Sequence, residues 1–375
     1  MDFDFSEDQQ ALRDAVRRFV DKDYTFERRQ QIVRAGGFDR AAWDGLAGLG
    51  VTALAVPEAH GGLGFGAVEA MVVMEELGRG LVLEPLAQGA LIAPALLGHA
   101  SADVQAAWLP RIAGGEALVV LAHQEARSRY RLNRVTTRAT DGKLTGVKSL
   151  VPVGDLADAF IVPARISGSD DAAEGIALYL VERSAPGVHT RAYSLHDGSR
   201  AAELHLDGTP GVLIAGPEEG LALLELAADI GIAAQAAEAV GVMEKYLALT
   251  VDYLNTRKQF GVAISSFQAL RHRTADVKMQ LELARSMSYY ATLRLGDAPA
   301  VRRRALSQAK VQLGASMRFV GQQCTQMHGG IGVTDEYIGS HYFKRLTVME
   351  MQWGDTLYHL GEVSARMQDT AGVFA

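Results

Sequence analysis

Two glycine-bearing stretches in the last third of the chain combine residue types that suit a nucleotide cofactor. They read Arg257-Lys258-Gln259-Phe260-Gly261 and Gln326-Met327-His328-Gly329-Gly330. An arginine at a helix end, followed by a helix-breaking glycine, places a guanidinium group beside free backbone groups, which suits a pyrophosphate. Paired glycines let a backbone approach a ribose or a phosphate closely. The first stretch alone is better interpreted as an ordinary helix end, so its assignment to a cofactor depends on the joint occurrence of the two. In the second stretch, Gln326 argues against a simple glycine stop.

The placement of proline and turn residues divides the chain into three regions. These regions must position the two glycine-bearing stretches. Residues 1–115 predict a helical domain, whose first helix opens with a capping box at Ser6-Glu7-Asp8-Gln9. Residues 116–217 hold short apolar runs between turn signals, which predict an antiparallel β-sandwich or barrel. Nine of the ten prolines lie at or before Pro217, so long helices are expected beyond it. Residues 218–375 therefore predict a four-helix bundle, and the alanines and glycines of its first helix allow close packing.

Composition narrows the class of protein. The chain has 375 residues, of which 48% are hydrophobic and 22% charged, as is typical of a globular protein. A net charge of -7 without a basic run argues against nucleic acid as a partner. The single cysteine, Cys324, allows no intramolecular disulfide and no cysteine-based zinc site. The acidic N-terminus does not read as a signal peptide and no apolar run reads as a membrane span, so we expect a cytoplasmic enzyme or binding protein.

The order of helical region, β region and helical bundle, together with the two glycine-bearing stretches, resembles the acyl-CoA dehydrogenase flavoproteins over the whole chain. The stretches Thr256–Leu270 and His341–Leu346 are similar, more narrowly, to the small subunits of pimeloyl-CoA dehydrogenases. The resemblance implies an FAD cofactor and motifs that reach across a dimer interface into the neighbouring subunit's site. His328 is expected to be a packing residue. Carried over by position, the residues that would line the FAD are Arg257, Lys258, Gln259, Phe267, Gln268, Gln326, Gly329 and Gly330.

The catalytic base that this resemblance implies is missing from both of its family positions. Most relatives take the α-proton of the acyl thioester with a glutamate directly before a Gly-Thr pair, and Trp353 stands at that position. A minority carry the glutamate 26 residues before the motif arginine, where this chain has Gly231. Asp355 is the candidate substitute and Glu350 a lesser one. A capping or solvated carboxylate is the favoured interpretation of both.

The β region also departs from the family pattern beside the flavin. Ala122-His123-Gln124 and Arg127-Ser128-Arg129 replace Thr-Glu-Pro and Gly-Ser-Asp stretches, and Leu150-Val151-Pro152 replaces a Trp-Ile-Thr strand. Elements that would hold the chain's own flavin ring are thus altered, whereas elements donated to a neighbour are kept. This distribution is expected of the non-catalytic half of a hetero-oligomer.

These observations predict a subunit that serves the FAD-dependent α,β-desaturation of an acyl-CoA substrate in a dimer or an α2β2 tetramer. A second acyl-CoA dehydrogenase-like subunit would supply the base, and an electron-transfer flavoprotein would accept the electrons. Two alternatives stay open. One is a self-sufficient homo-oligomer in which Asp355 or another acid abstracts the proton, and the other is a flavin-free scaffold of the same fold.

Overall fold

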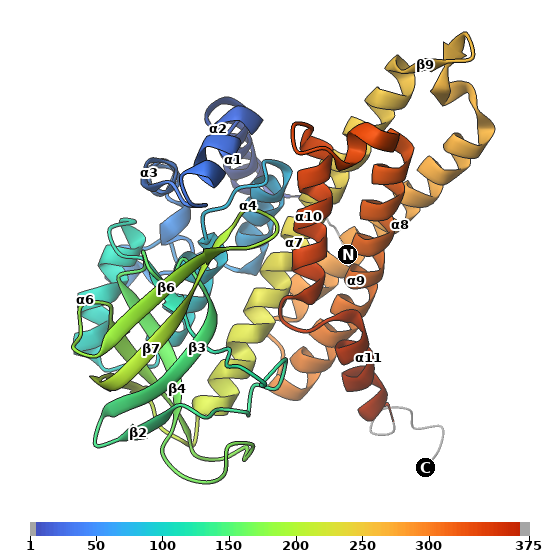
Figure 1. Ribbon diagram of the computed structural model, residues 1–375. Helices are drawn as coiled ribbons and strands as arrows, with labels where there is room; N and C mark the ends of the chain where they lie inside the picture. The colour runs from blue at the N-terminus through green and yellow to red at the C-terminus, as the bar shows by residue number, and fades with distance from the viewer. Residues whose placement is uncertain (1–4, 368–375) are drawn as a thin grey trace. The chain divides into compact units, whose positions relative to one another are not determined.

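The computed structural model describes residues 5–367, and Figure 1 shows the course of the chain. The chain forms two compact units, of which one comprises residues 1–29, 71–82 and 232–375. The other comprises residues 30–70 and 83–231. We call them the helical unit and the β unit. The predicted division into three domains, 1–115, 116–217 and 218–375, stays a prediction beside this two-unit division.

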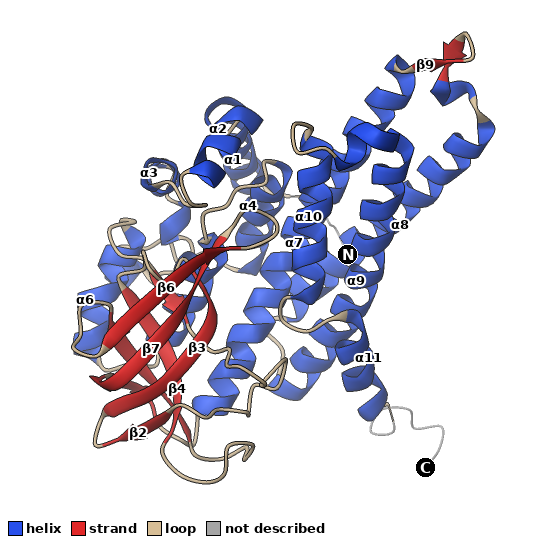
Figure 2. Cartoon of the chain, in the orientation of Figure 1, coloured by secondary structure: helices blue, strands red, loops and turns tan. Residues whose placement is uncertain are grey.

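Helices account for most of the described chain (Figure 2). The helices are α1 (Glu7–Asp23), α2 (Phe26–Arg34), α3 (Arg40–Gly48), η1 (Val51–Ala53), η2 (Glu58–His60), α4 (Ala67–Arg79), η3 (Ala87–Ile92), α5 (Ala93–Leu97), α6 (Ala102–Ala113), α7 (Gly220–Thr256), η4 (Ile264–Ser266), α8 (Gln268–Arg294), α9 (Pro299–His328), η5 (Gly329–Val333), α10 (Ile338–Met351) and α11 (Thr356–Ala365). The strands are β1 (Val119–Leu121), β2 (Arg138–Thr140), β3 (Lys143–Pro152), β4 (Ala159–Arg165), β5 (Ile176–Glu182), β6 (Val188–Ser194), β7 (Arg200–Pro210), β8 (Val212–Ala215), β9 (Lys258–Gln259) and β10 (Val262–Ala263).

The capping box predicted at the start of the first helix is confirmed. The backbone N–H of Gln9 donates to Ser6 Oγ at 3.2 Å, and the backbone N–H of Ser6 donates to Gln9 Oε1 at 3.0 Å. Both groups would otherwise lack an intrahelical partner, so the reciprocal bonds fix the first turn of α1.

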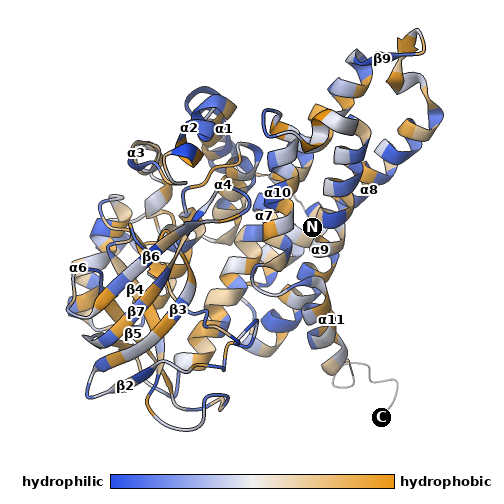
Figure 3. Cartoon of the chain, viewed as in Figure 1, coloured by the Kyte–Doolittle hydropathy of each residue, from blue (hydrophilic) through white to orange (hydrophobic). Residues whose placement is uncertain are grey.

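The predicted β domain is confirmed as one mixed sheet. Its strand order is β6-β7-β3-β2-β4-β5-β8, with β1 beside β4. Most neighbouring strands are antiparallel as expected, but β1 and β2 each pair with β4 in parallel. Strands β4 and β5 are buried along almost their whole length, and Figure 3 shows the hydrophobic colour along them. Burial on both faces explains why their sequences are continuous apolar runs without alternation.

The predicted helical bundle is confirmed in the helical unit, where α7, α8, α9 and α10 share one hydrophobic core. Small residues let backbones touch, as expected. A Cβ added to Gly241 of α7 would lie 1.9 Å from the carbonyl oxygen of Glu75, and one added to Gly78 of α4 would lie 2.1 Å from that of Glu238. The helices α4 and α7 therefore pack at a distance that only glycine permits at these two positions.

Helix α7 alone among the helices of the described residues is long and apolar enough to cross a membrane. This is weak evidence for a span, because 72% of its most apolar 18-residue window is buried inside the chain. Such burial is typical of the central helix of a bundle.

Gly241→Ala tests the close packing of α4 and α7. The new methyl group would meet the Glu75 carbonyl, so we expect the free energy of unfolding to fall by about 1–3 kcal/mol in urea titrations followed by circular dichroism. The matched control is Gly361→Ala in α11, where an added Cβ would meet nothing within 4 Å. This control should gain stability by up to about 1 kcal/mol through helix propensity. Equal stability of Gly241→Ala and the wild type would contradict the packing argument.

Candidate cofactor-binding and active-site residues

The Arg257 stretch folds as a two-stranded hairpin between α7 and α8, labelled β9 in Figure 1. Strand β9 pairs with β10 in antiparallel, and the turn between them consists of Phe260 and Gly261. Both turn residues have positive φ angles, 54° and 81°. This is the backbone geometry of a type I′ turn, which explains why a glycine follows the aromatic residue. The predicted helix end at Arg257 is thus extended into a hairpin that the sequence did not reveal.

The hairpin presents the predicted cofactor residues to solvent. Arg257, Lys258, Gln259 and Gln268 are exposed. Phe267 packs edge-on against Phe260, with the ring centroids 6.0 Å apart, and Phe260 itself is 91% exposed. Within the described part of the chain, the guanidinium group of Arg257 has neither an ion pair nor a hydrogen bond. An unpaired cation beside exposed aromatic rings is a surface suited to a nucleotide.

The second stretch forms the end of α9 and the short helix η5. Gly329 ends α9 with a φ of 65°, and a Cβ added to Gly329 or Gly330 would meet nothing within 4 Å. Both glycines and Gln326 are exposed. His328 is buried, its Nδ1 lies 2.8 Å from the carbonyl oxygen of Cys324, and its ring is enclosed by tyrosines. His328 therefore packs as expected, while the glycine backbone is open to a ligand.

The two stretches lie at the same end of the bundle. The ring of Tyr253, in the last turn of α7, is 4.7 Å from the ring of His328. The backbone N–H of Arg257 donates to the carbonyl of Tyr253 at 2.8 Å. Thr274 of α8 also donates its hydroxyl to the sulfur of Met327 at 3.6 Å. Residues about 70 positions apart in sequence thus meet around one end of the helical unit, which the motifs alone could not establish.

The family position of the catalytic base lies in the turn between α10 and α11. Trp353 has a φ of 60° and Gly354 a φ of 106°, so the chain reverses through left-handed backbone. The carbonyl oxygen of Trp353 accepts a hydrogen bond from Nε2 of His359 at 2.8 Å. The side chain of Trp353 packs against the core. An indole offers one N–H donor and no proton acceptor, so Trp353 cannot abstract a proton. Gly231, the second family position, lies within α7.

Both carboxylates considered as substitutes are used inside this turn. Asp355 is the N-cap of α11, and its side chain accepts from the backbone N–H of Tyr358 at 2.8 Å. Glu350 accepts from the backbone N–H and the hydroxyl of Thr356, at 3.2 and 2.8 Å, and from Arg318 at 3.0 Å. Each carboxylate therefore has a structural role of the kind favoured from the sequence. A catalytic role for Asp355 stays a prediction.

Three buried or half-buried side chains next to the α10–α11 turn form a hydrogen-bonded series, which we call the buried polar chain. The sequence did not predict it. Lys310 of α9 is 1% exposed, and its Nζ donates to Oε1 of Gln235 at 2.6 Å and to the carbonyl of Met349 at 2.7 Å. Nε2 of Gln235 in turn donates to Oε1 of Gln352 at 2.9 Å. Gln235 follows Gly231 by one helical turn, and Gln352 directly precedes Trp353. The buried polar chain thus connects the sequence neighbours of both family positions of the base. The closeness of Gln235 to Gly231 and of Gln352 to Trp353 in the sequence is the signal that could have indicated it.

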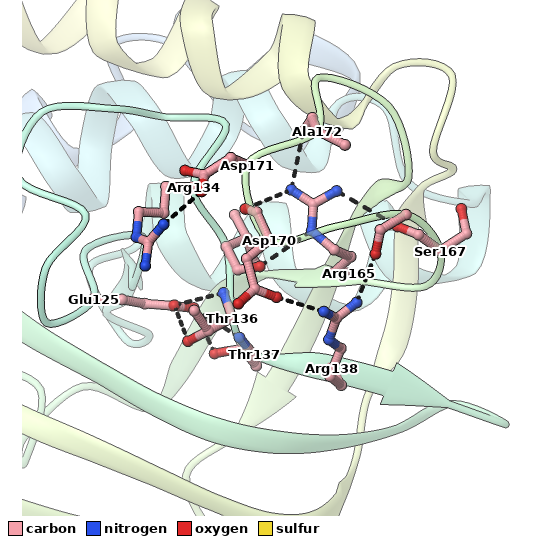
Figure 4. Close-up of polar contacts among 12 residues, drawn as sticks. Glu125, Arg134, Thr136, Thr137, Arg138, Arg165, Ser167, Asp170, Asp171 and Ala172 are labelled. Carbon is pink, nitrogen blue, oxygen red and sulfur yellow. Dashed lines mark hydrogen bonds and ion pairs between the residues drawn. The ribbon is translucent and has the colours of Figure 1, made fainter.

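The β-unit loop that replaces the family's flavin-side stretches is anchored by the buried carboxylate of Glu125 (Figure 4). It accepts from the Lys148 ammonium at 2.6 Å and from backbone and hydroxyl groups of Thr136 and Thr137. Burial alone would raise the pKa of Glu125, but the Lys148 charge and these hydrogen bonds lower it to about 2. The carboxylate is ionised and fully bonded, so it holds the loop and is not free for chemistry.

The hydroxyl group of Ser128 is not available to a cofactor. Ser128 is 4% exposed, and its Oγ donates to the carbonyl of Glu125 at 2.8 Å while accepting from the backbone N–H of Glu125 at 3.2 Å. The flanking Arg127 and Arg129 have φ angles of 70° and 52°. The hydroxyl is therefore enclosed in its own turn, and the side chains beside it are exposed arginines.

The strand expected against a flavin ring is interrupted. The pairing of β3 with β7 shifts register between Lys148 and Val151, where Leu150 takes a φ of 53°. The backbone N–H of Leu150 donates to the hydroxyl of Tyr193 at 2.9 Å. Pro152, which follows, has no N–H to donate. The N–H of Leu150 is thus bonded within the β unit, and Pro152 has none.

Comparisons with known proteins agree with the geometry of fold and motifs. The family described as "Acyl-CoA dehydrogenase, N-terminal domain" matches residues 6–116, and "Acyl-CoA dehydrogenase, C-terminal domain" matches residues 218–368. Acyl-CoA dehydrogenase IpdE2 of Mycobacterium tuberculosis is 32% identical over 341 residues, covering 90% of this chain and 91% of that protein. Acyl-CoA dehydrogenase FadE27 of the same organism is 27% identical over 379 residues, covering 99% of this chain and 100% of that protein.

A solved structure extends the likeness to three dimensions. A chain of the ChsE4-ChsE5 complex from Mycobacterium tuberculosis superposes with a TM-score of 0.87 at 26% identity, over 99% of this chain and 100% of that one. The present chain therefore belongs to the acyl-CoA dehydrogenase family. Members of this family bind FAD, so the fold class and the cofactor predicted from the sequence are confirmed.

Lys310→Met tests the buried polar chain through the pH dependence of stability. Burial lowers the pKa of Lys310 to about 7, although Glu350 and Asp355 act to raise it. An unfolded lysine has a pKa of about 10.4, so between about pH 7 and 10 the unfolded chain binds more protons than the folded one. Stability from this group must therefore rise with pH across that window, by at most about 1.4 kcal/mol per pH unit.

We expect urea titrations from neutral to alkaline pH to give a shallower rise for Lys310→Met than for the wild type. The exposed Lys245 of α7 supplies the matched control, because Lys245→Met should leave the slope unchanged. Identical slopes for the wild type and Lys310→Met would show that this amino group is not buried as described.

Proposed function

We propose that this chain is one subunit of an FAD-dependent acyl-CoA dehydrogenase with two kinds of subunit, and that it completes the FAD site of its partner. One observation carries the proposal. The polar groups of the two motifs are exposed and open, whereas the carboxylates near the family base position are bonded within the fold. Arg257, Gln259, Gln268, Gln326 and Gly330 are the residues assigned to the partner's FAD.

The residues of the two motifs fit the dinucleotide part of FAD. The unpaired guanidinium of Arg257 can give two parallel hydrogen bonds to a pyrophosphate oxygen pair. The open backbone at Gly329 and Gly330 lets a ribose or phosphate approach without a side chain in the way. When bound, FAD accepts the β-hydrogen of the acyl thioester as a hydride, and a positioned base takes the α-proton. This chain's part is to bind and orient the nucleotide, and the partner subunit supplies the base.

The residue at the family position of the catalytic base supports a non-catalytic role for this chain. Trp353 has no proton acceptor on its side chain. Asp355 and Glu350 hold the α10–α11 turn through the hydrogen bonds described above. Ser128 is enclosed in its own turn, and the β3 segment at Leu150 is irregular. The self-sufficient alternative would need Asp355 to leave its capping bond before it could reach a substrate.

The assembly and the substrate are part of the proposal. The solved ChsE4-ChsE5 structure is described as a complex of two named proteins, which supports a hetero-oligomeric dimer or α2β2 tetramer here. We extend the proposal to an electron-transfer flavoprotein as electron acceptor and to the cytoplasm as compartment. The likeness of Thr256–Leu270 and His341–Leu346 to the small subunits of pimeloyl-CoA dehydrogenases extends it to a dicarboxylyl-CoA substrate such as pimeloyl-CoA.

Flavin content tests the proposal directly. The chain purified alone should lack the visible absorbance of bound flavin. Co-expressed with a second acyl-CoA dehydrogenase-fold protein that carries an intact Glu-Gly-Thr sequence, it should yield a yellow complex active on an acyl-CoA. Arg257→Ala should weaken FAD binding by the complex by roughly 10- to 100-fold in fluorescence titrations, because a charged hydrogen bond contributes about 1.5–3 kcal/mol. Arg18→Ala, at an exposed arginine of α1, is the matched control and should leave FAD binding unchanged.

Two results would each favour a different alternative. Tight flavin binding and turnover of an acyl-CoA by the chain alone would show a self-sufficient enzyme. Unchanged flavin content of every complex with Arg257→Ala would favour a scaffold that takes no part in cofactor binding.

Asp355→Asn distinguishes the proposed complex, in which the partner supplies the base, from the self-sufficient enzyme, in which Asp355 is the base. Asparagine caps a helix about as well as aspartate, so the variant should keep the fold and its melting temperature. Its amide cannot act as a base, and loss of a general base lowers the rate by about 100- to 10,000-fold. We expect the active complex with Asp355→Asn to turn over acyl-CoA at the wild-type rate. A fall of that size in kcat at unchanged stability would instead place the base at Asp355.

A further inference from the structure

Two histidines stand side by side on the outer face of the sheet in the β unit. Strands β6 and β7 are antiparallel neighbours (Figures 1 and 2), and His189 of β6 lies directly opposite His205 of β7. Directly opposite residues of an antiparallel pair project from the same face, with Cβ atoms about 4.5–5.5 Å apart. Both histidines are exposed, while Leu204 and Leu206, which alternate with His205, are buried. The two imidazoles therefore share one solvent-facing surface.

A carboxylate adjoins the pair. Glu203 lies two residues before His205 and on the same face, with its Oε2 3.5 Å from Nε2 of His205. Glu203 stands opposite Arg191, whose guanidinium nitrogens Nε and Nη2 donate to the same oxygen at 3.1 and 2.8 Å. The carboxylate thus offsets the nearest positive charge, so the surface at the two histidines is not closed to a cation.

We propose that His189 and His205 together bind a divalent transition-metal ion of the kind that prefers imidazole, such as Zn²⁺. Neutral imidazole nitrogen is a preferred ligand of zinc, copper and nickel, at about 2.0–2.1 Å for zinc. Two rings whose Cβ atoms lie about 5 Å apart can direct one nitrogen each to a common ion. Within residues 5–367 no group of three or more histidine, cysteine, aspartate or glutamate side chains is placed to hold a metal. The ion would therefore have two protein ligands, with water in its remaining positions.

The place of the pair in the sheet leaves such an ion accessible. Strand β6 is the first strand of the sheet order, so its outer edge has no further strand beside it. An ion held by two histidines at this edge keeps open positions, which a ligand from solution or another molecule can occupy. The site is built only from residues of the β unit and is independent of the cofactor residues in the helical unit.

Equilibrium dialysis of the full-length, tag-free chain against Zn²⁺, with the bound metal counted by mass spectrometry, tests the proposal. We expect the His189→Ala/His205→Ala variant to lose one equivalent of Zn²⁺ relative to the wild type. Each single substitution should weaken that equivalent by roughly 100-fold, because the second ligand acts at a high effective concentration. Zn²⁺ should raise the melting temperature of the wild type and not that of the double variant. Mg²⁺, which prefers oxygen ligands, should not compete.

The control is His99→Ala, which removes a single exposed histidine elsewhere in the β unit and should leave the stoichiometry unchanged. Circular dichroism of the metal-free variants checks that the fold is intact, as expected for substitutions at exposed positions. The proposal is overturned if the wild type binds no Zn²⁺, or if the double variant keeps the same equivalents at the same affinity. An equal loss in His99→Ala would also overturn it.

Discussion

The amino group of Lys310 must find oxygen partners inside a hydrophobic core, and this requirement shapes the end of the chain. Burying a charge without partners costs several kcal/mol, so the side chain is tolerated only where oxygens surround it. Gln235 of α7 and the carbonyl of Met349 at the end of α10 supply them. Gln235 then uses its amide N–H to hold Gln352, which precedes Trp353. One buried amino group thereby connects α7, α9 and the turn that holds the family position of the base.

The turn itself is held by bonds that leave it no spare acid. A residue other than glycine in the left-handed region costs about 1–2 kcal/mol, and Trp353 takes that conformation only because its surroundings fix it. His359 holds its carbonyl, Asp355 caps the following helix and Glu350 ties Thr356 to Arg318. The Trp353 carbonyl, Asp355 and Glu350 are therefore all hydrogen-bonded within the helical unit. The exposed Arg257, directly before β9, is the reverse case, because its guanidinium group has no partner among residues 5–367.

Local signals made parts of this structure predictable. The capping box at Ser6 and the helix end before Gly261 depend on neighbouring residues, and each appears where expected. The parallel pairing of β1 and β2 with β4 could not be predicted from the short apolar runs, because the sequence of a strand does not determine which strand it pairs with. The bond from Lys310 to Gln235 spans 75 positions, and the bond from Lys148 to Glu125 spans 23. Such pairs become visible only when the fold brings the elements together, since a lysine in a helical sequence normally predicts an exposed side chain.

The turn between α10 and α11 is stabilised by the residues that surround the family position of the base. Random loss of an acid would leave unsatisfied groups or a cavity at its former position, each costing about 1–3 kcal/mol. Here the carbonyl of Trp353 and the carboxylates of Asp355 and Glu350 are hydrogen-bonded and stabilise the turn, while Nδ1 of His359 has no hydrogen-bond partner within residues 5–367. A glutamate placed at Trp353 would leave the β unit unchanged, in which the Ser128 hydroxyl is enclosed and Pro152 has no N–H. The cofactor motifs are less constrained by the fold: the side chain of Arg257 has neither an ion pair nor a hydrogen bond among the described residues, and a Cβ added to Gly330 would meet nothing within 4 Å, so the stability of the fold does not require these two residue types.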